Sequence, residues 1–327
     1  GPRTGRIDDR AAMVRAMSSV YCLMGPTGSG KTELALALAR RFPVEVISVD
    51  SAQIYRHLNI GTAKPEPRVL AEVPHRLIDI CDPDESYSAA QFRVDARREI
   101  ERIRSHGRIP LLVGGTGLYY RVLTEGIAEL PTSDPAVRAR IEAEIASTGL
   151  RAAHARLREI DPIAARRIHP NDPQRITRAL EVHALTGEPM TRVLARNTRP
   201  GLNLPVKKLA LVPEDRTWLR ARLETRFRSM VDAGLINEVR ALFDRGLANR
   251  GDPALKLVGY REVTHYLEGA YGLEQMVRLA TTASRQLAKR QITWLRRERD
   301  LTVLDPRRPA LMDTAIGALG FDDKSGT

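Results

Sequence analysis

Apolar residues in the first 130 positions form short continuous runs separated by stretches with helical spacing. Such runs predict buried strands when β-branched residues are frequent and turn residues follow. Strands are predicted at 19–24, 44–49, 75–80 and 109–113. Helices are predicted at 32–41 and 88–106. Strands that alternate with helices indicate an α/β fold, with a parallel sheet covered on both faces.

The pattern changes after Pro131. From Asp134 to about Leu194 the spacing is helical throughout, and 207–212 then reads as one more strand before long helices. We therefore expect an α/β core at 18–130 and 206–306, interrupted by a helical insertion domain at 131–205. Disordered or loose segments are expected at 1–17 and 307–327.

The composition fits a globular protein. Of 327 residues, 43% are hydrophobic and 28% are charged, which excludes collagen-like and disordered classes. No apolar run approaches the ~20 residues of a membrane helix, so we expect no membrane association and a cytoplasmic protein. Two cysteines, Cys22 and Cys81, are too few for a disulfide framework.

Positive charge is concentrated in the later part of the chain. The net charge is +12. Residues 1–130 hold 18 basic and 16 acidic side chains, whereas 131–327 hold 34 and 24. This asymmetry indicates either a polyanionic partner for the later region or arginine-rich solvated helix faces. Charge alone leaves both open.

The strongest chemical signal is GPTGSGKT at 25–32, which fits the phosphate-loop pattern G-x-x-x-x-G-K-[ST] between a predicted strand and helix. Its glycines let backbone N–H groups turn inward around an anion, and the helix N-terminus adds partial positive charge. Lys31 is expected to reach phosphate oxygens, and Thr32 to ligate Mg²⁺. The residues expected to bind a diphosphate or nucleotide are Gly25, Pro26, Thr27, Gly28, Ser29, Gly30, Lys31 and Thr32.

Asp50 follows the strand at 44–49, at the sheet edge where ligands of parallel sheets bind. Three roles are open for it: an outer carboxylate for Mg²⁺, a general base facing an acceptor, or a capping residue for the following turn. Gly114-Gly115-Thr116-Gly117 follows another strand and brings one hydroxyl to the same edge.

Together these segments resemble the bacterial tRNA dimethylallyltransferases, also called isopentenyl-tRNA transferases. The resemblance covers nearly the whole chain up to about Pro306, in seven colinear motifs. These are GPTGSGKT (25–32), DSAQIYRHLNIGTAKP (50–65), HRLIDICDP (75–83), GGTGLYY (114–120), PNDPQRITRALEV (170–182), GYRE (259–262) and RQLAKRQITWLR (285–296).

The resemblance implies a P-loop NTPase-like core and transfer of a dimethylallyl group from dimethylallyl diphosphate to N6 of the adenosine beside the anticodon of tRNA. Asp50 matches the family's general base, and Thr116 a position that touches the tRNA near the reacting base. Lys31 and Thr32, the latter through Mg²⁺, would stabilise the leaving diphosphate. Arg261 in GYRE would contact either the diphosphate or a tRNA phosphate.

The resemblance also implies that the tRNA anticodon stem-loop is the polyanionic partner. Arg285, Lys289 and Arg296 fall within ~40° of one another on a helix, as a stripe along a phosphate backbone would. The residues expected to contact tRNA are Asp50, Ser51, Ala52, Gln53, Thr116, Arg138, Gln174, Arg175, Ile176, Thr177, Arg178, Arg285, Gln286, Lys289 and Arg290.

Two other function classes compete with this hypothesis. One is a P-loop kinase for a small metabolite or nucleoside, and the other is a nucleic-acid-binding NTP switch. The histidines show no spacing typical of a zinc site. No heptad or exposed strand pattern suggests assembly, so a monomer is expected.

Overall fold

The computed structural model describes residue 14 and residues 16–321, so most of the expected leader at 1–17 lies outside the described residues. The chain divides into two units. The larger unit comprises residues up to Thr124 together with the chain from Leu202 onward, and the smaller unit is Glu125–Gly201. The boundaries lie four to six residues before the expected limits of the insertion, 131 and 205.

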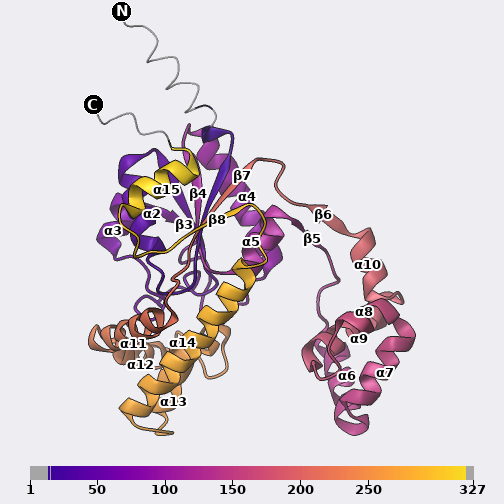
Figure 1. The fold of residues 1–327 in the computed structure, drawn as a ribbon. Coiled ribbons are helices and arrows are strands. Elements are labelled where there is room, and N and C mark those ends of the chain that lie inside the picture. Colours follow the sequence, from indigo (N-terminus) through magenta and orange to yellow (C-terminus); the bar gives the residue numbers. More distant parts are fainter. Residues whose placement is uncertain (1–13, 15, 322–327) are drawn as a thin grey trace, which may run out of the picture. The chain divides into compact units, whose positions relative to one another are not determined.

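A parallel sheet of six strands, in the order β3-β2-β4-β1-β7-β8, forms the centre of the larger unit within its described part (Figure 1). The predicted α/β fold class is therefore confirmed. The strands are β1 (Val20–Met24), β2 (Val44–Val49), β3 (His75–Arg76), β4 (Ile109–Gly114), β7 (Val206–Leu211) and β8 (Leu301–Leu304). Because β1, β2 and β4 are buried throughout, they need the continuous apolar runs seen in the sequence.

Helices cover both faces of this sheet. α2 (Lys31–Arg41) and α15 (Leu311–Leu319) pack on one face, where Tyr21 and Leu23 of β1 join Leu34 and Leu38 in a single apolar cluster. α4 (Ala89–Ser105) and α5 (Gly117–Thr124) lie on the opposite face (Figure 1). α3 (Pro67–Glu72) follows the loop after β2.

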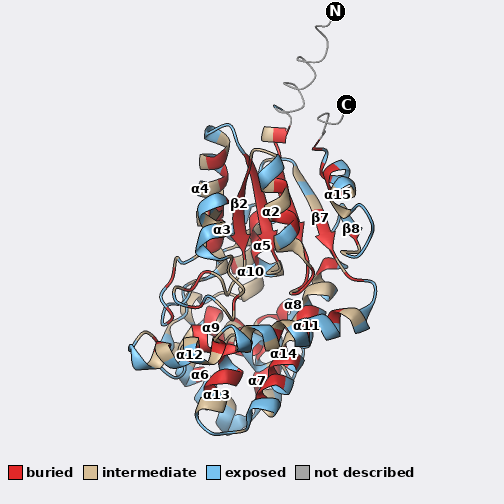
Figure 2. Cartoon of the chain, turned by 90° about the vertical axis from the view of Figure 1, so that its left-hand side faces the viewer, coloured by how far each residue is buried: buried red, intermediate tan, exposed pale blue. Residues whose placement is uncertain are grey.

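A second apolar core joins the loop after β2 to the C-terminal helices. Ile54, Tyr55 and Leu58 pack with buried residues from the helices that follow β7. In Figure 2 these helices show buried inner faces and exposed outer ones. They are α11 (Arg216–Asp232), α12 (Leu235–Asp244), the 3-10 helix η1 (Pro253–Lys256), α13 (Tyr260–Leu267) and α14 (Leu273–Leu295). The core fixes the loop after β2 against them.

The smaller unit is mainly helical and has an apolar core of its own, which includes Leu157, Ile176 and Leu180. Two short antiparallel strands, β5 and β6, pair within it. Its elements are β5 (Gly126–Ala128), α6 (Pro135–Thr148), α7 (Leu150–Ile160), α8 (Pro162–Arg167), α9 (Pro173–Thr186), α10 (Met190–Arg196) and β6 (Thr198–Pro200).

Two predictions differ from the structure. The strand expected at 75–80 ends at Arg76, because Leu77 and Asp79 have φ angles of 62° and 56°, which an extended strand cannot contain. The segment from 307 is not a loose tail as far as it is described. α15 buries Ala315, Ile316 and Leu319 against the sheet, a role that its short apolar pattern did not reveal.

Candidate active site

The ends of three neighbouring parallel strands bring the predicted residues to one edge of the sheet. β4 pairs with β1 on one side and β2 on the other, so Gly114 aligns with both Met24 and Val49. The loop carrying Thr116 therefore lies between the phosphate loop after β1 and Asp50 after β2. This edge is where parallel sheets bind their ligands.

The phosphate loop has the backbone geometry that anion binding requires. Gly28 and Gly30 have φ angles of 79° and 88°, a region that other residues rarely adopt. Gly30 caps α2, so the first N–H groups of that helix face the loop without helical partners. The Lys31 ammonium donates to the Pro26 carbonyl at 3.2 Å. The Ser29 hydroxyl is buried and has no hydrogen-bond partner among the described atoms.

Three side chains from the C-terminal helices hold the outer side of this loop. Arg222 Nε donates to the Gly28 carbonyl at 2.7 Å, and Arg226 donates to the Thr27 hydroxyl at 3.0 Å. Gln291 accepts from the Thr27 N–H at 2.9 Å. The N–H and hydroxyl of Thr27 are thus already bound, and Thr27 serves to fix the loop. Sequence reasoning missed Arg222, Arg226 and Gln291, because their partners are about 190 to 260 residues away.

Positive charge is gathered and partly desolvated at this loop. Burial and, to a smaller extent, the nearby Arg226 lower the pKa of Lys31 to about 8, although Asp50 and Glu33 act in the opposite direction. Burial also lowers the pKa of Arg226, again opposed by Asp50. Cations held together in this way are poised to bind an anion, because an anion relieves both their repulsion and their desolvation.

The carboxylate of Asp50 has one oxygen fixed by the backbone. Oδ1 accepts hydrogen bonds from the N–H groups of Ala52 at 2.7 Å and Gln53 at 3.3 Å. Oδ2 has no hydrogen-bond partner within the part of the chain that is described. The turn that follows the strand therefore orients the carboxylate and leaves one oxygen available. This geometry combines the capping role with the possibility of accepting a proton.

Thr116 joins the loop after β4 to the segment after Asp50. Its hydroxyl oxygen accepts from the Ser51 N–H at 3.1 Å, and its own N–H donates to the Val49 carbonyl. The two loops meet so closely that a Cβ on Gly114 would collide with the carbonyl of Val49. Asp50 and Thr116 therefore form one rigid corner of the site.

The segment from Ser51 to Lys64 is strongly constrained. The Gln53 amide donates to the carbonyls of Thr62 and Ala63 and accepts from the Ser48 hydroxyl. Gln53 was predicted to contact tRNA, but here its side chain forms hydrogen bonds within the protein. Lys64 is nearly buried and forms an ion pair with Asp79 at 2.5 Å. These interactions hold the turn in place.

Backbone strain lies in the same region. His57, Ala63, Leu77 and Asp79 have positive φ angles between 51° and 70°. Such conformations persist only where the surroundings fix them, and they cluster at functional sites. The strain therefore agrees with a functional role for the loop after Asp50.

The predicted tRNA contacts in the smaller unit divide into exposed and internal residues. Gln174 and Arg175 are exposed on α9, and Arg138 forms an ion pair with Glu142. Ile176 and Thr177 have exposed fractions of 0% and 2%. The helical period therefore turns their side chains into the core of the unit, away from the surface that a tRNA could reach.

Arg178 also points inward. It forms an ion pair with the fully buried Glu181 at 2.7 Å and donates to the carbonyl of Pro131. Glu181 additionally accepts from Ser133 and from the backbone of Asp134. Arg178 is itself partly exposed, and this network of contacts gives it a structural function.

Basic side chains without carboxylate partners gather on α14 and its C-terminal turn. Residues 275–297 contain six basic and no acidic side chains, and all six are exposed. Within the described structure none of the six forms an ion pair. They are Arg278, Arg285, Lys289, Arg290, Arg296 and Arg297. The predicted stripe of Arg285, Lys289 and Arg296 is part of this patch, and Gln286 is exposed beside it.

Arg261 lies at the start of α13 and donates twice to the buried carboxylate of Glu262, at 3.0 and 2.7 Å. Glu262 in turn accepts from the Gly259 N–H. About half of the Arg261 side chain is exposed. The ion pair with Glu262 fixes the position of Arg261. It does not show whether Arg261 contacts the diphosphate or a tRNA phosphate.

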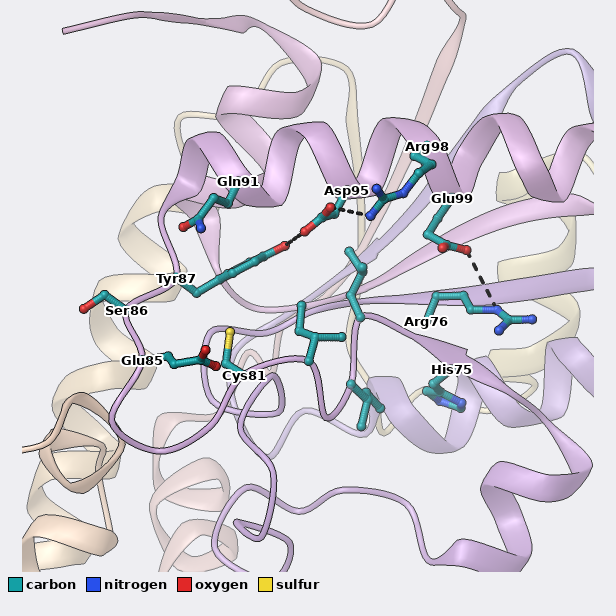
Figure 3. A pocket seen from close by; sticks show the side chains of 13 residues that line it. His75, Arg76, Cys81, Glu85, Ser86, Tyr87, Gln91, Asp95, Arg98 and Glu99 are labelled. Carbon is teal, nitrogen blue, oxygen red and sulfur yellow. Dashed lines mark hydrogen bonds and ion pairs between the residues drawn. The ribbon is translucent and has the colours of Figure 1, made fainter. Parts of the chain in front are cut away.

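A separate hollow of about 740 Å³ lies between the segment after β3 and the first turns of α4 (Figure 3). Several of its charged side chains have partners within the protein. Asp95 accepts from Tyr87 at 2.7 Å and from Arg98 at 2.6 Å, and Arg76 lies 3.9 Å from Glu99. Burial raises the pKa of Tyr87, and Asp95 adds to this effect. None of the predicted site residues lines this hollow.

The described residues contain no group of three or more His, Cys, Asp or Glu side chains arranged to hold a metal ion. Thr32 is the one predicted metal ligand. Both cysteines are buried free thiols, and burial raises the pKa of Cys22 to about 12. Among the helices that are described, none is long and apolar enough to span a bilayer.

Comparison with known sequences agrees with the site. A family model described as IPP transferase matches residues 53–298, and one described as isopentenyl transferase matches residues 18–79. The chain is 53% identical over 304 residues to the tRNA dimethylallyltransferase of Halorhodospira halophila, covering 92% of this chain and 98% of the relative. It is 55% identical over 283 residues to that of Alkalilimnicola ehrlichii, covering 86% and 89%.

Solved structures agree with these sequences. The full-length tRNA isopentenylpyrophosphate transferase of Bacillus halodurans is 37% identical, with a TM-score of 0.64 over 92% of this chain and 97% of the other. A eukaryotic dimethylallyltransferase acting on tRNA is 27% identical, with a TM-score of 0.78 over 91% and 78%. The similarity includes both the phosphate-loop core and the segments after Asp50, and the chain belongs to the tRNA dimethylallyltransferase family.

Proposed function

We propose that this protein transfers a dimethylallyl group from dimethylallyl diphosphate to N6 of the adenosine 3′-adjacent to the anticodon of tRNA, giving N6-(dimethylallyl)adenosine. The observation that carries this proposal is the meeting of an anion-binding phosphate loop and the oriented carboxylate of Asp50 at one sheet edge, in a chain of this family. The loop serves the leaving group, and the carboxylate serves the nucleophile.

The diphosphate binds in the phosphate loop. N–H groups at the start of α2 and the Lys31 ammonium would donate to it, and the guanidinium of Arg226 adds positive charge beside the loop. When the bond between C1 and oxygen breaks, negative charge develops on the diphosphate. Fixed donors that are already aimed at this charge stabilise the transition state without reorganising.

The residues of the loop fit Mg²⁺ bound together with the diphosphate. The Thr32 hydroxyl lies at the start of α2 and has no hydrogen-bond partner in the described structure. One protein oxygen plus phosphate oxygens and water is the usual arrangement for Mg²⁺ in phosphate sites, which does not require an acidic cage. When bound, the ion would neutralise charge on the leaving diphosphate.

Asp50 accepts the proton that N6 loses. The exocyclic amine is a weak nucleophile because its lone pair is delocalised into the ring, so removal of its proton as the N6–C1 bond forms assists the reaction. The unbound Oδ2 can take this proton while Oδ1 stays fixed by the backbone. Thr116 lies beside it and orients the reacting base.

The tRNA is held by its phosphates and delivers a single extruded base. In a stacked adenine, N6 cannot be reached by both the Asp50 carboxylate and the dimethylallyl donor. The nucleotide must therefore leave the stack, which costs a few kcal/mol. Anticodon loops are already partly unpaired, which lowers this cost. The unpaired basic patch on α14 supplies charge for the backbone, and we expect the enzyme to work in the cytoplasm, where tRNA is found.

Label transfer tests the proposal. The protein is incubated with Mg²⁺, an anticodon stem-loop and dimethylallyl diphosphate that is radiolabelled in its carbon skeleton. The label should move to the RNA and free diphosphate should accumulate. ATP hydrolysis without labelling of the RNA would favour the kinase or switch hypotheses instead.

A further inference from the structure

Gln291 on α14 bridges two loops of the site with the two ends of one amide. Its Oε1 accepts from the Thr27 N–H at 2.9 Å, and its Nε2 donates to the Gly115 carbonyl at 3.1 Å. Thr27 belongs to the phosphate loop, and Gly115 directly precedes Thr116. One side chain from a distant helix therefore spans the donor side and the acceptor side of the site.

The space around this bridge is tight. A Cβ on Gly115 would collide with the Gln291 amide and come within 2.8 Å of the Gly25 carbonyl. Two residues further on, a Cβ on Gly117 would collide with the ring of Trp294, which stacks on Tyr120. α14 thus contacts the loop after β4 at two successive turns, and glycines at 115 and 117 make the approach possible.

The Gln291 bridge connects two loops that are each fixed by other side chains. Thr27 is fixed on its hydroxyl by Arg226 and on its N–H by Gln291, whereas Thr116 is fixed on its hydroxyl by Ser51. The amide of Gln291 links these two fixed loops directly. Substrates held by the two loops must have their reacting atoms about 3–3.5 Å apart and in line.

We propose that Gln291 is a positioning residue, whose amide sets the separation between the phosphate loop and the Thr116 loop, and so between the leaving diphosphate and the acceptor amine. The inference rests on the proposed function. Gln291 touches neither the reacting carbon nor N6 in this account. It acts through Thr27 and Gly115, and its effect should therefore appear in the rate of transfer more than in binding.

Two variants separate this role from simple packing. Gln291→Met keeps the length of the side chain but removes both hydrogen bonds. Gln291→Glu keeps an acceptor for Thr27 and places a second oxygen against the Gly115 carbonyl. The matched control is Gln275→Met at the start of α14, where the amide accepts only from Arg278.

The measurement is single-turnover transfer at saturating dimethylallyl diphosphate and stem-loop, together with the Kd of each substrate and the melting temperature. Both Gln291 variants should transfer about 10- to 100-fold more slowly, because a misplacement near 1 Å can cost about 100-fold. Each Kd should change less than about threefold, within the range of a minor contact. Gln275→Met should match the wild type.

A double-mutant cycle with Thr116→Val provides the decisive readout. If Gln291 acts by placing the Thr116 loop, the double variant should be little slower than the slower single variant. Fully additive losses would overturn the proposal, as would a loss confined to the Kd of dimethylallyl diphosphate. If the wild type transfers no label at all, the proposed function fails, an outcome distinct from additive losses in active variants.

Discussion

The two oxygens of Asp50 have different environments, and this difference gives the residue both its orientation and its reactivity. Oδ1 caps the turn through Ala52 and Gln53, whereas Oδ2 remains without a partner in the described structure. From the sequence, capping and general-base roles were alternatives. The geometry makes them compatible, because a carboxylate can cap with one oxygen and accept a proton with the other.

Replacement of Asp50 by Asn tests whether the carboxylate acts as a general base, because Asn has nearly the same shape as Asp. Asn keeps an Oδ1 acceptor for the two backbone N–H groups, so the turn should persist, but it cannot take a proton from N6. We expect single-turnover transfer to fall at least ~100-fold, as for loss of a positioned base. Stem-loop affinity should change little, and Asp313→Asn on the exposed start of α15 is the control. A near-normal rate would leave Asp50 as a capping residue only.

Lys31 makes donor binding dependent on pH. Its pKa is lowered to about 8 by burial and by Arg226, so below pH 8 it is already charged when the diphosphate arrives. Above this value binding must be accompanied by proton uptake, because the anion favours the ammonium form. The Kd of dimethylallyl diphosphate should therefore rise above pH 8, by up to about tenfold per pH unit.

Calorimetric titration of the donor from pH 6.5 to 9.5 measures this effect. Lys31→Ala should bind more weakly at low pH and show a flat profile above pH 8, since the titrating group is gone. An unchanged slope in this variant would assign the proton to another group. Stem-loop affinity should be insensitive to the substitution, and an equally steep loss there would mean that the loop contacts RNA.

At the residue scale, the contiguous part of the site could be predicted from sequence, but its supports could not. The conformation of GPTGSGKT can be predicted from its own residues, because the loop needs positive φ angles at positions 28 and 30 and both positions are glycine. Arg226 and Gln291 contact the loop although they lie 199 and 264 residues away in the sequence, and no local sequence pattern predicts contacts over such separations. The burial of the Ile176 and Thr177 side chains was not foreseen, because a motif gives residue types and not the helix face on which they lie.

Among the elements, α14 and α9 differ in whether their basic residues are paired. Arg285, Lys289 and Arg290 on α14 are exposed and have no carboxylate partner in the described chain. On α9, Arg178 is bound to buried Glu181, and exposed Arg175 lies 3.4 Å from Asp172. An unpaired cation is free to replace a counterion on RNA, so these three residues of α14 should contribute more to the electrostatic part of tRNA binding than Arg175 and Arg178 of α9.

The salt dependence of stem-loop binding measures this difference. Replacing Arg285, Lys289 and Arg290 by Ala should make the slope of log K against log salt shallower by about two units, at roughly 0.7–0.9 per phosphate contact. The control variant removes the same charge from paired arginines, Arg40, Arg196 and Arg228. An equal change of slope in both variants would show a general effect of net charge and not a binding surface.

Arg178 should affect stability rather than binding. Its removal leaves the buried carboxylate of Glu181 with only Ser133 and one backbone N–H as donors. We expect Arg178→Ala to destabilise the smaller unit by about 1–3 kcal/mol, the cost of a broken buried hydrogen bond to a charged group. Thermal unfolding checks this, with Arg175→Ala as the exposed control. An unaltered melting temperature with a shallower salt slope would place Arg178 on the RNA instead.

The elements themselves were predictable where the pattern was continuous. β1, β2 and β4 are buried along their whole length and therefore read as uniform apolar runs. β8 and α15 were missed, because β8 is a four-residue edge strand with two exposed positions and the apolar pattern of α15 spans only nine residues. β3 was predicted too long, since positive φ angles at non-glycine residues are imposed by surrounding contacts and leave no composition signal.

On the scale of the whole molecule, the excess of basic side chains divides into residues that form ion pairs and residues that do not. Residues 131–327 carry the excess, but within the smaller unit many arginines form ion pairs with carboxylates of the same unit, including those at positions 138, 156, 175, 178, 196 and 199. Six other arginines of that unit are exposed and form no ion pair within the described chain: Arg140, Arg151, Arg158, Arg166, Arg167 and Arg192. In the larger unit, α14 carries a patch of basic side chains that are likewise without ion pairs, and the same helix supplies Gln291 to the catalytic edge. One helix would then both bind tRNA phosphates and align the two substrates.

The central claim is that the sheet edge joins a diphosphate leaving group to an adenosine amine. The most direct measurement uses two anticodon stem-loops that differ in one nucleoside, with adenosine or inosine 3′ of the anticodon, in a transfer reaction with labelled dimethylallyl diphosphate and Mg²⁺. The account predicts label on the adenosine stem-loop, recovered as N6-(dimethylallyl)adenosine after nuclease digestion, and none on inosine, which lacks the amine. Equal labelling of both RNAs, or of neither while ATP is consumed, would contradict it.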